Sequence, residues 1–304
     1  MAMRVILVSL GLVVLVWVVL RASDRWYARR IERQQQAWSE TIERDAEGVR
    51  AGFAPWSLGE GGTALLFIPG FAGAPSLYQR MAPALAERGY ACRAMRLPGF
   101  GDPFDRAATV TAADWLEAVE RELDGLRAEH DEVWLVGHSL GAALALQVGQ
   151  WDPDRAAGVV LLAPLIEVSG RRSPVLPPAR WYAIGRRLFK STAMLESNFP
   201  LDLQDESAGP LVQRDRFIPI NLYHAVFDTL DGLPRPEDFA LPVLMMVAPG
   251  DAIADPAAAQ AWFKRLPVAH RHLQVETDAG HVLPLDTGWD RRVQEIDDFI
   301  RSAP

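Results

Sequence analysis

The chain has 304 residues, of which 49% are hydrophobic and 23% charged, a composition that excludes disorder and is sufficient for one large core or two small ones. Its net charge of −8 provides no basic surface for nucleic acid, and the usual binding motifs are absent, so we expect no nucleic-acid partner. The single cysteine, Cys92, cannot form an internal disulfide, and no Cys/His cluster has zinc-ligand spacing, so no structural metal is expected.

The first segment of the chain is apolar and uncharged from residue 5 to residue 20. We predict an uncleaved transmembrane anchor over residues 1–21, although Ala22 offers a weak cleavage position for a signal peptide. Only Arg4 precedes the run, whereas several basic residues follow it: Arg21, Arg25, Arg29, Arg30 and Arg33. By the positive-inside rule, we expect a single-pass protein of the inner or plasma membrane whose C-terminal part is cytoplasmic.

Residues 22–50 are charged and favour a helix, so we predict a helical stalk between the membrane and a domain over residues 51–304. Ile31, Trp38, Ile42 and Val49 could instead pair with a partner helix, but sustained heptads are too few.

The domain alternates short apolar runs with amphipathic stretches. Strands are predicted over 63–70, 91–97, 132–139, 157–164, 242–249 and 271–277, and helices over 75–88, 111–130, 140–150, 256–266 and 289–301. This alternation indicates an α/β fold, with a mostly parallel sheet covered by helices on both faces.

The alternation is interrupted between Ala163 and Leu241, where no convincing strand is found. A structureless loop of that length is improbable in a compact domain, so we predict a small helical cap inserted over about 165–220. Open parallel sheets bind ligands beyond the carboxyl ends of their strands, and the cap would lie above that edge.

Ser139 lies in the pentapeptide Gly-His-Ser-Leu-Gly, between a predicted strand and a predicted helix. The pentapeptide alone arises by chance about once in ten such chains, and a tight turn that happens to hold a serine is the simpler interpretation. At this junction, however, glycines at 137 and 141 would relieve crowding and let the hydroxyl project above the sheet. The backbone N–H of Leu140 would point into the same space, as half of an oxyanion hole.

A serine nucleophile needs a base within hydrogen-bond reach, and six histidines are available. His281 follows the last predicted strand through a short loop, where an imidazole can face the carboxyl edge of the sheet. His138 is expected to point away from Ser139 as a packing residue, and the other histidines are also expected to be structural: His130, His224, His270 and His272.

The carboxylate that orients the base should follow another strand, in the chain order Ser, Asp, His. Asp251 comes immediately after the predicted strand 242–249 and is the preferred candidate. Asp255 is an alternative, but it precedes Pro256 and is better explained as a helix N-cap. Asp286 is expected to hold the loop around His281 in place.

A second oxyanion donor should come from the loop that follows the strand at 63–70. In the sequence Pro-Gly-Phe-Ala-Gly-Ala-Pro, the best candidate is the backbone N–H of Phe71, whose ring could also line an acyl pocket. Taken alone, this loop would be read as a tight glycine turn.

Over roughly residues 50–302, these motifs resemble the α/β-hydrolase superfamily. More narrowly, they are similar to the carboxylesterases and monoacylglycerol lipases with a short helical cap, a branch also described as serine aminopeptidase-like hydrolases. "GHSLG", "FIPGFAG", "RLPGFGD", "APGDAIAD" and "AGHVLPLD" carry the resemblance. It implies Ser139 as nucleophile, His281 as base, Asp251 as orienting acid, and the backbone of Phe71 and Leu140 as oxyanion donors.

Two positions depart from the family's pattern, since Pro69 and Phe100 stand where histidines are usual. Because the oxyanion donors are backbone groups, Pro69 need not abolish activity.

We therefore expect a serine hydrolase that cleaves carboxylic esters through an acyl-enzyme and requires no cofactor. A carboxylate nucleophile, as in dehalogenases, is disfavoured because position 139 is serine. An amidase or aminopeptidase using the same triad and a non-catalytic, membrane-tethered binding module remain as alternatives. An aminopeptidase would use acidic cap residues: Glu196, Asp202, Asp205 and Glu206.

The expected substrate is a small acyl ester. A lipid-like ester, such as a monoacylglycerol or lysophospholipid, is favoured by the anchor and by the aromatic, apolar and basic residues of the cap. An ordinary solvated basic face explains the cap equally well. The residues concerned are Trp181, Tyr182, Leu188, Phe189, Arg180, Arg186, Arg187 and Lys190.

Overall fold

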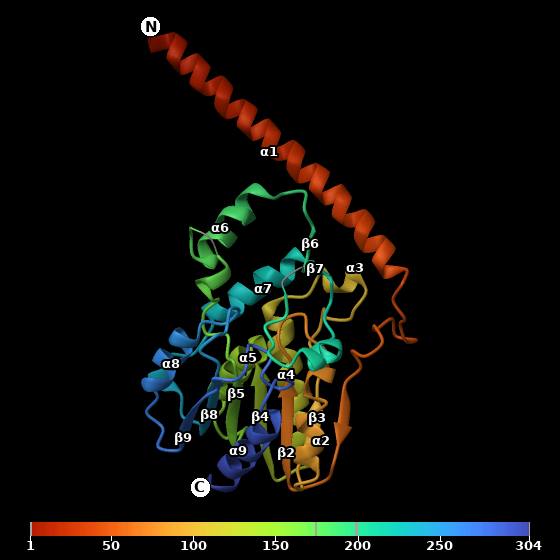
Figure 1. Ribbon diagram of the computed structural model, residues 1–304, viewed down its shortest axis with the longest axis vertical. Helices are drawn as coiled ribbons and strands as arrows, with labels where there is room; N and C mark the ends of the chain where they lie inside the picture. The colour runs from red at the N-terminus through yellow and green to blue at the C-terminus, as the bar shows by residue number, and fades with distance from the viewer. Residues whose placement is uncertain (1, 174, 198–199, 304) are drawn as a thin grey trace.

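The computed structural model describes residues 2–173, 175–197 and 200–303. Met1, residues 174, 198 and 199 of the expected cap, and Pro304 lie outside the described residues. Within the described chain, strands form a seven-stranded sheet of order β1-β3-β2-β4-β5-β8-β9 (Figure 1). The strands are β1 Trp56–Leu58, β2 Thr63–Ile68, β3 Ala91–Ala94, β4 Glu132–His138, β5 Gly158–Leu162, β8 Val243–Val247 and β9 Arg271–Val275.

The sheet is parallel except for β1, which pairs antiparallel with β3. The six predicted strands are confirmed, and β1 was missed because three residues are too short to show a period. Helices of the main body are η1 Pro75–Tyr78, α2 Met81–Ala86, α3 Phe104–Ala107, α4 Ala112–Arg127, α5 Leu140–Trp151, α8 Pro256–Lys264 and α9 Trp289–Arg301. The single helix expected over 75–88 is divided into η1 and α2, which places Pro83 in a first helical turn, where it needs no N–H.

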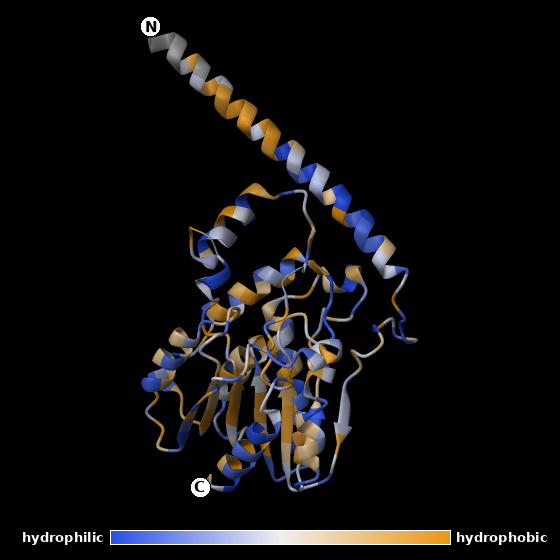
Figure 2. Ribbon diagram, viewed as in Figure 1, coloured by the Kyte–Doolittle hydropathy of each residue, from blue (hydrophilic) through white to orange (hydrophobic). Residues whose placement is uncertain are grey.

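Helices cover both faces of the sheet, as predicted. Successive side chains of a strand point to opposite faces, so Leu66 and Ile68 of β2 join one core cluster while Leu65 and Phe67 join the other. The first cluster includes residues of α4, α5 and α8, and the second includes residues of α2 and α9. Figure 2 shows the resulting apolar strands between more polar helices.

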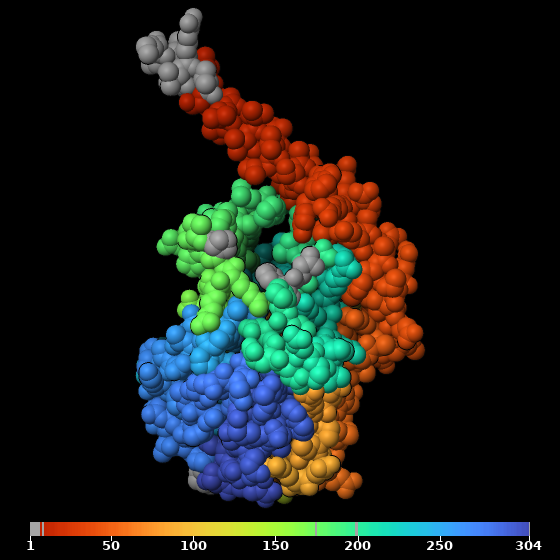
Figure 3. Space-filling view, viewed as in Figure 1, coloured from red at the N-terminus to blue at the C-terminus, as the bar shows by residue number. Residues whose placement is uncertain are grey.

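A cap connects β5 to β8. Its elements are η2 Gly170–Arg172, α6 Pro178–Leu188, β6 Met194–Glu196, η3 Glu206–Leu211, β7 Phe217–Pro219, α7 Ile220–Asp231 and η4 Pro236–Asp238. The expectation of no strand between residues 163 and 241 is wrong, because β6 and β7 form an antiparallel ribbon. Each strand has only three residues, too few for a recognisable pattern. The space-filling view shows a hollow between α6 and the neighbouring cap segments, beside α1 (Figure 3).

The N-terminal residues form one helix, α1 Ala2–Ser39, which ends before residue 50, where the predicted stalk was expected to end. In its C-terminal half, Ile31 packs against Met194 and Phe217 of the cap ribbon. The carboxylate of Asp24, only 1% exposed, accepts hydrogen bonds from the backbone N–H groups of residues 190, 191 and 192. The cap and the C-terminal half of α1 therefore form one packed unit.

The N-terminal half of α1 projects away from the domain (Figure 1). Its described apolar side chains, at Leu7 and from Leu10 to Leu20, are exposed. Of the helices in the described residues, none has the length and apolar character needed for a membrane span.

Candidate active site

Ser139 lies on a sharp turn between β4 and α5. Its φ of 54° falls in the left-handed region that non-glycine residues rarely adopt. The flanking glycines are required by close approach: a Cβ at Gly141 would lie 2.1 Å from the carbonyl oxygen of Ile68, and one at Gly137 would lie 2.4 Å from that of Gly141. The two glycines let the helix, the strand and the turn approach closely enough to hold Ser139 in this conformation.

His281 and Asp251 meet at the carboxyl edge of the sheet. The Nδ1 of His281 lies 2.7 Å from Oδ2 of Asp251, and both side chains are buried. The other carboxylate oxygen of Asp251 accepts from the backbone N–H groups of Ile253 and Ala254, at 2.7 and 2.9 Å. Burial raises the pKa of Asp251, but the charge of His281 and these hydrogen bonds together hold it below its usual value. Asp251 is therefore an ionised acceptor that fixes the orientation of the imidazole.

Two predictions for neighbouring carboxylates are confirmed. Asp255 caps α8 by accepting from the N–H groups of Ala257 and Ala258. Asp286, fully buried, accepts from the N–H of Gly280 at 2.7 Å and so holds the loop that carries His281. It also accepts from the N–H groups of residues 204 and 205, which ties this loop to the cap.

The prediction that His138 points away from the site is wrong. Its Nε2 lies 2.9 Å from the carbonyl oxygen of His281, and the two rings are 4.8 Å apart. Burial, together with the nearby His281, lowers the pKa of His138 to about 3, so its ring is neutral at ordinary pH and Nε2 carries the proton donated to that carbonyl. Sequence reasoning missed this contact because it joins residues from β4 and a distant loop.

A pocket of about 170 Å³ brings together Ser139, His281 and Phe71, whereas Asp251 and Leu140 are not among its lining residues. His138 and Gly70 also line it. The amide of Leu140 lies in the first turn of α5, where backbone N–H groups have no partner within the helix. The pocket thus brings a serine and an oriented imidazole together with the loop that carries Phe71, and Leu140 follows the serine directly in the chain.

The model of the alpha/beta hydrolase family matches residues 65–295. The chain belongs to this family. A carboxylesterase of Bacillus subtilis is 23% identical over 251 residues, which are 81% of this chain and 95% of that enzyme. A thermostable monoacylglycerol lipase of Bacillus sp. (strain H-257) is 28% identical over 120 residues, 40% of this chain and 48% of that lipase, so the match spans about half of its length.

Solved structures of other hydrolases have the same fold. A structure reported for LipS and LipT, two metagenome-derived lipolytic enzymes, superposes with a TM-score of 0.73 at 21% identity, covering 83% of this chain and 98% of that chain. The monoacylglycerol lipase of Paleococcus ferrophilus superposes with a TM-score of 0.69 at 20% identity, covering 83% of this chain and 99% of that chain.

One departure from the family's pattern has a structural explanation in this hydrolase. Phe100, which stands in place of a histidine, is fully buried, and its ring contacts that of Phe71 with centroids 5.3 Å apart. Tyr223 of the cap contacts Phe71 from another direction at 5.0 Å. The aromatic contacts fix the side chain of Phe71 and with it the loop whose backbone N–H is the candidate oxyanion donor.

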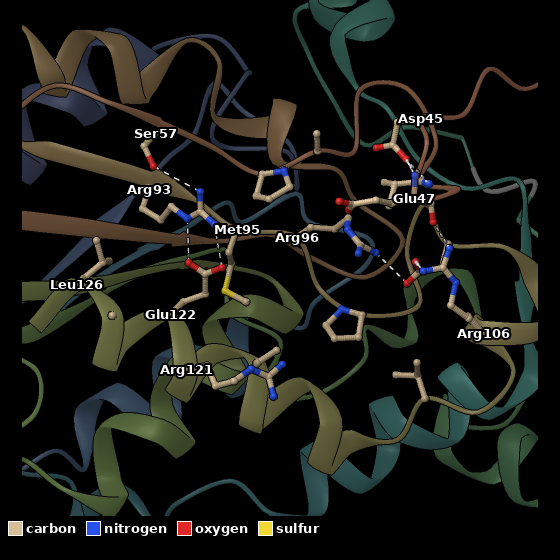
Figure 4. Close-up of a pocket in the computed structure, with 18 of the residues that line it drawn as sticks. Asp45, Glu47, Ser57, Arg93, Met95, Arg96, Arg106, Arg121, Glu122 and Leu126 are labelled. Carbon is tan, nitrogen blue, oxygen red and sulfur yellow. Dashed lines mark hydrogen bonds and ion pairs between the residues drawn. The ribbon is translucent and has the colours of Figure 1, made fainter. Parts of the chain in front are cut away.

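A larger groove of this hydrolase, about 870 Å³, lies apart from these side chains (Figure 4). Its arginines face carboxylates: Arg93 binds Glu122 through two hydrogen bonds, and Arg96 lies 2.8 Å from Asp102. The residues that line this groove include no histidine that could activate a serine, so we assign the catalytic chemistry to the smaller pocket. Groups of acidic, histidine or cysteine residues that could hold a metal ion are not found among the described residues.

Proposed function

We propose that the protein is a serine hydrolase that cleaves carboxylic esters through an acyl-enzyme. The observation that supports this most is that Ser139 and His281 line one pocket, while Asp251 bonds the far nitrogen of His281 at 2.7 Å. A serine, an imidazole and a carboxylate so arranged have the roles of nucleophile, base and orienting group. The similarity to a carboxylesterase and a monoacylglycerol lipase supports the same reaction class.

In the proposed mechanism, Oγ of Ser139 attacks the ester carbonyl as Nε2 of His281 accepts its proton. Asp251 retains the Nδ1–H hydrogen bond and stabilises the imidazolium without taking the proton. The N–H groups of Phe71 and Leu140 stabilise the negative oxygen of the tetrahedral intermediate. His281 then protonates the leaving alcohol, and in the second half-reaction it activates the water that hydrolyses the acyl-enzyme.

The exposed side of α6 supports a lipid-like ester as the substrate. No residue of α6 is buried, and Ile184, Leu188 and Phe189 are each more than a third exposed. Arg186 and Arg187 lie on the same short helix, which has no acidic residue. A helix with apolar and basic residues and no acidic ones is suited to an anionic lipid surface.

We also propose that the exposed apolar half of α1 associates with a membrane, because its large apolar side chains have no partner surface within the described chain. Fractionation of cells that express the full chain and a variant starting at Asp24 tests this. We expect the full chain in the membrane fraction and the shortened variant in the supernatant. Equal distribution of the two forms would count against membrane association.

An aminopeptidase activity has less support. Of the four acidic cap residues that could bind an amine, Glu196 pairs with Arg216, Asp205 pairs with Arg80, and Asp202 uses one carboxylate oxygen to accept from the N–H of residue 252. A non-catalytic binding role would be expected to lack a member of the triad, whereas all three side chains are present.

Labelling with a fluorophosphonate probe tests the nucleophile. Ser139→Ala should abolish labelling and ester hydrolysis without changing the thermal unfolding temperature. Ser197→Ala is a matched control, because Ser197 lines the same pocket and should not be required for labelling. Labelling of Ser139→Ala at the wild-type rate would refute the assignment.

A further inference from the structure

Arg292 occupies a position of α9 where an apolar side chain would be expected. It is fully buried, and the next residue, Val293, and Ile296 one turn later both belong to a hydrophobic core cluster. Residues four apart lie on the same face of a helix, so Arg292 shares the buried face of α9 with Ile296. A charged side chain at such a position must be explained by the groups that it binds.

The groups that Arg292 binds belong to the base loop, residues 276–288, which connects β9 to α9. The guanidinium donates to the carbonyl of Leu283 at 2.8 Å through Nη1 and to that of Thr287 at 2.7 Å through Nη2. Nη2 also lies 3.1 Å from the carboxylate of Glu276, which is the first residue of the loop and is fully buried. One side chain therefore ties the beginning of the base loop to its end.

His281 lies between the points at which the base loop is held. On one side, the N–H of Gly280 donates to the carboxylate of Asp286 at 2.7 Å, and Arg292 binds the carbonyl of the same aspartate at 3.3 Å. On the other side, the N–H of Leu283 donates to the carbonyl of His281 at 2.9 Å, and Arg292 binds the carbonyl of Leu283. The backbone on each side of His281 is thus connected to Arg292 through a single residue.

These contacts with the base loop are what distinguish a guanidinium from an apolar side chain at position 292. Burial is the largest influence on the pKa of Arg292 and lowers it, so the charge is costly there, and Glu276 offsets that cost only in part. Replacing a buried ion pair by apolar residues of similar volume is often neutral or stabilising. Core packing therefore does not require Arg292, whereas a fixed base loop does.

We propose that Arg292 is a positioning residue for His281, which acts through the base loop on the rate of ester hydrolysis. A general base must keep its geometry to act, and a misplacement of about 1 Å caused by a distant substitution can slow a reaction about a hundredfold. Arg292 is not among the residues that line the pocket, so we expect it to affect kcat rather than substrate binding. This inference rests on the proposed function and adds a residue to its machinery.

Substitution of Arg292 tests the inference with a short-chain nitrophenyl ester. Arg292→Met removes the guanidinium but keeps an unbranched apolar stem, so we expect kcat to fall about 10- to 100-fold while KM changes by less than about threefold. Arg292→Lys keeps the charge but not the planar fork, so its kcat should lie between those of the wild type and Arg292→Met. Amide hydrogen exchange at residues 280–287 should be faster in both variants, and unchanged exchange would show that Arg292 does not hold the loop.

Arg291→Gln is the matched control. Arg291 is the neighbour of Arg292 on α9 and pairs with the same Glu276, at 2.5 Å, but its other ion pairs are with the side chains of Asp278 and Glu295. The substitution removes one partner of Glu276 without releasing the carbonyls that Arg292 holds. Because a half-exposed ion pair contributes little, kcat should stay within about threefold of the wild-type value.

Loss of folded protein is separated from loss of rate by counting active sites. The final extent of fluorophosphonate labelling gives the folded fraction, and kcat is expressed per labelled site, which a purely structural role of Arg292 would leave unchanged. Arg292→Met is the deciding variant, or Arg292→Lys if Arg292→Met does not fold. Wild-type kcat per labelled site in the deciding variant, a loss confined to KM, or an equal loss in Arg291→Gln would overturn the positioning role while leaving ester hydrolysis intact.

A wild type that hydrolyses no ester would instead refute the proposed function. The rate constant of fluorophosphonate labelling, which also depends on the base, then takes the place of kcat. Equal rate constants in the wild type and the deciding variant would overturn the positioning role. A wild type that takes no label at Ser139 would overturn both proposals.

Discussion

Gly141→Ala is the most direct test of why the serine turn needs its glycines. The added Cβ would lie 2.1 Å from the carbonyl oxygen of Ile68 and 2.7 Å from that of Pro69. Both oxygens belong to the backbone at the C-terminal end of β2, so no flexible side chain can move aside to relieve the contact. Since nonbonded atoms at optimal contact are about 3.5 Å apart, β2 and α5 must separate by roughly 1 Å.

Overpacking of this kind costs about 1–3 kcal/mol and occasionally more, whereas alanine in place of glycine inside a helix stabilises by up to about 1 kcal/mol. We therefore expect Gly141→Ala to lower the free energy of unfolding by about 2 kcal/mol, with an unchanged m-value in urea. It should also slow fluorophosphonate labelling, because the shifted backbone adjoins Phe71.

Gly125→Ala is the matched control. Gly125 lies inside α4, and a Cβ there would meet nothing within 4 Å, so the substitution should stabilise the protein by about 0.5–1 kcal/mol. If Gly141→Ala were as stable as Gly125→Ala and were labelled at the wild-type rate, close approach would not explain the glycine.

Three other perturbations follow from the site and the cap. Asp251→Asn should reduce kcat for ester hydrolysis by about a thousandfold or more, because the imidazole loses its ionised acceptor, while Asp255→Asn, at a helix cap, should leave kcat within about threefold. Because the pKa of His138 is about 3 in the fold and 6.5 in the unfolded chain, its protonation in the unfolded chain should lower stability by up to about 1.4 kcal/mol per pH unit as pH falls from 6.5 toward 3. Urea unfolding at pH 7, 5.5 and 4.5 should show that the free energy of unfolding depends less on pH in His138→Gln than in the wild type. An equal pH dependence in the two proteins would contradict a buried neutral ring. Asp24→Ala leaves the N–H groups at 190–192, of which that of residue 192 is buried, without their acceptor, so it should cost about 1–3 kcal/mol and accelerate amide hydrogen exchange there; unchanged exchange would show that Asp24 does not hold the cap.

Much of the main body is readable from local patterns. Most of the predicted strands are apolar runs long enough to be recognised, although β9 is largely polar, and the serine turn has glycines where the backbone needs them. Asp251 and His281 were found because each follows a strand, and the carboxyl ends of parallel strands meet at one edge. Topology of this kind places residues without requiring knowledge of side-chain packing.

Other features depend on contacts between segments that no local pattern connects. The three-residue strands of the cap ribbon form because they pair with each other and pack on α1. His138 contacts the carbonyl of His281 only because the strand β4 and the loop of His281 come together in the fold. In the same way, Arg214 lies opposite Gly73 only because the cap packs on the loop after β2. The amino-acid sequence by itself determined the fold class and the candidate triad, because those follow from periodicity and chain order. The tertiary structure decided the pocket wall, because burial and hydrogen bonding between distant segments select which polar groups face the serine.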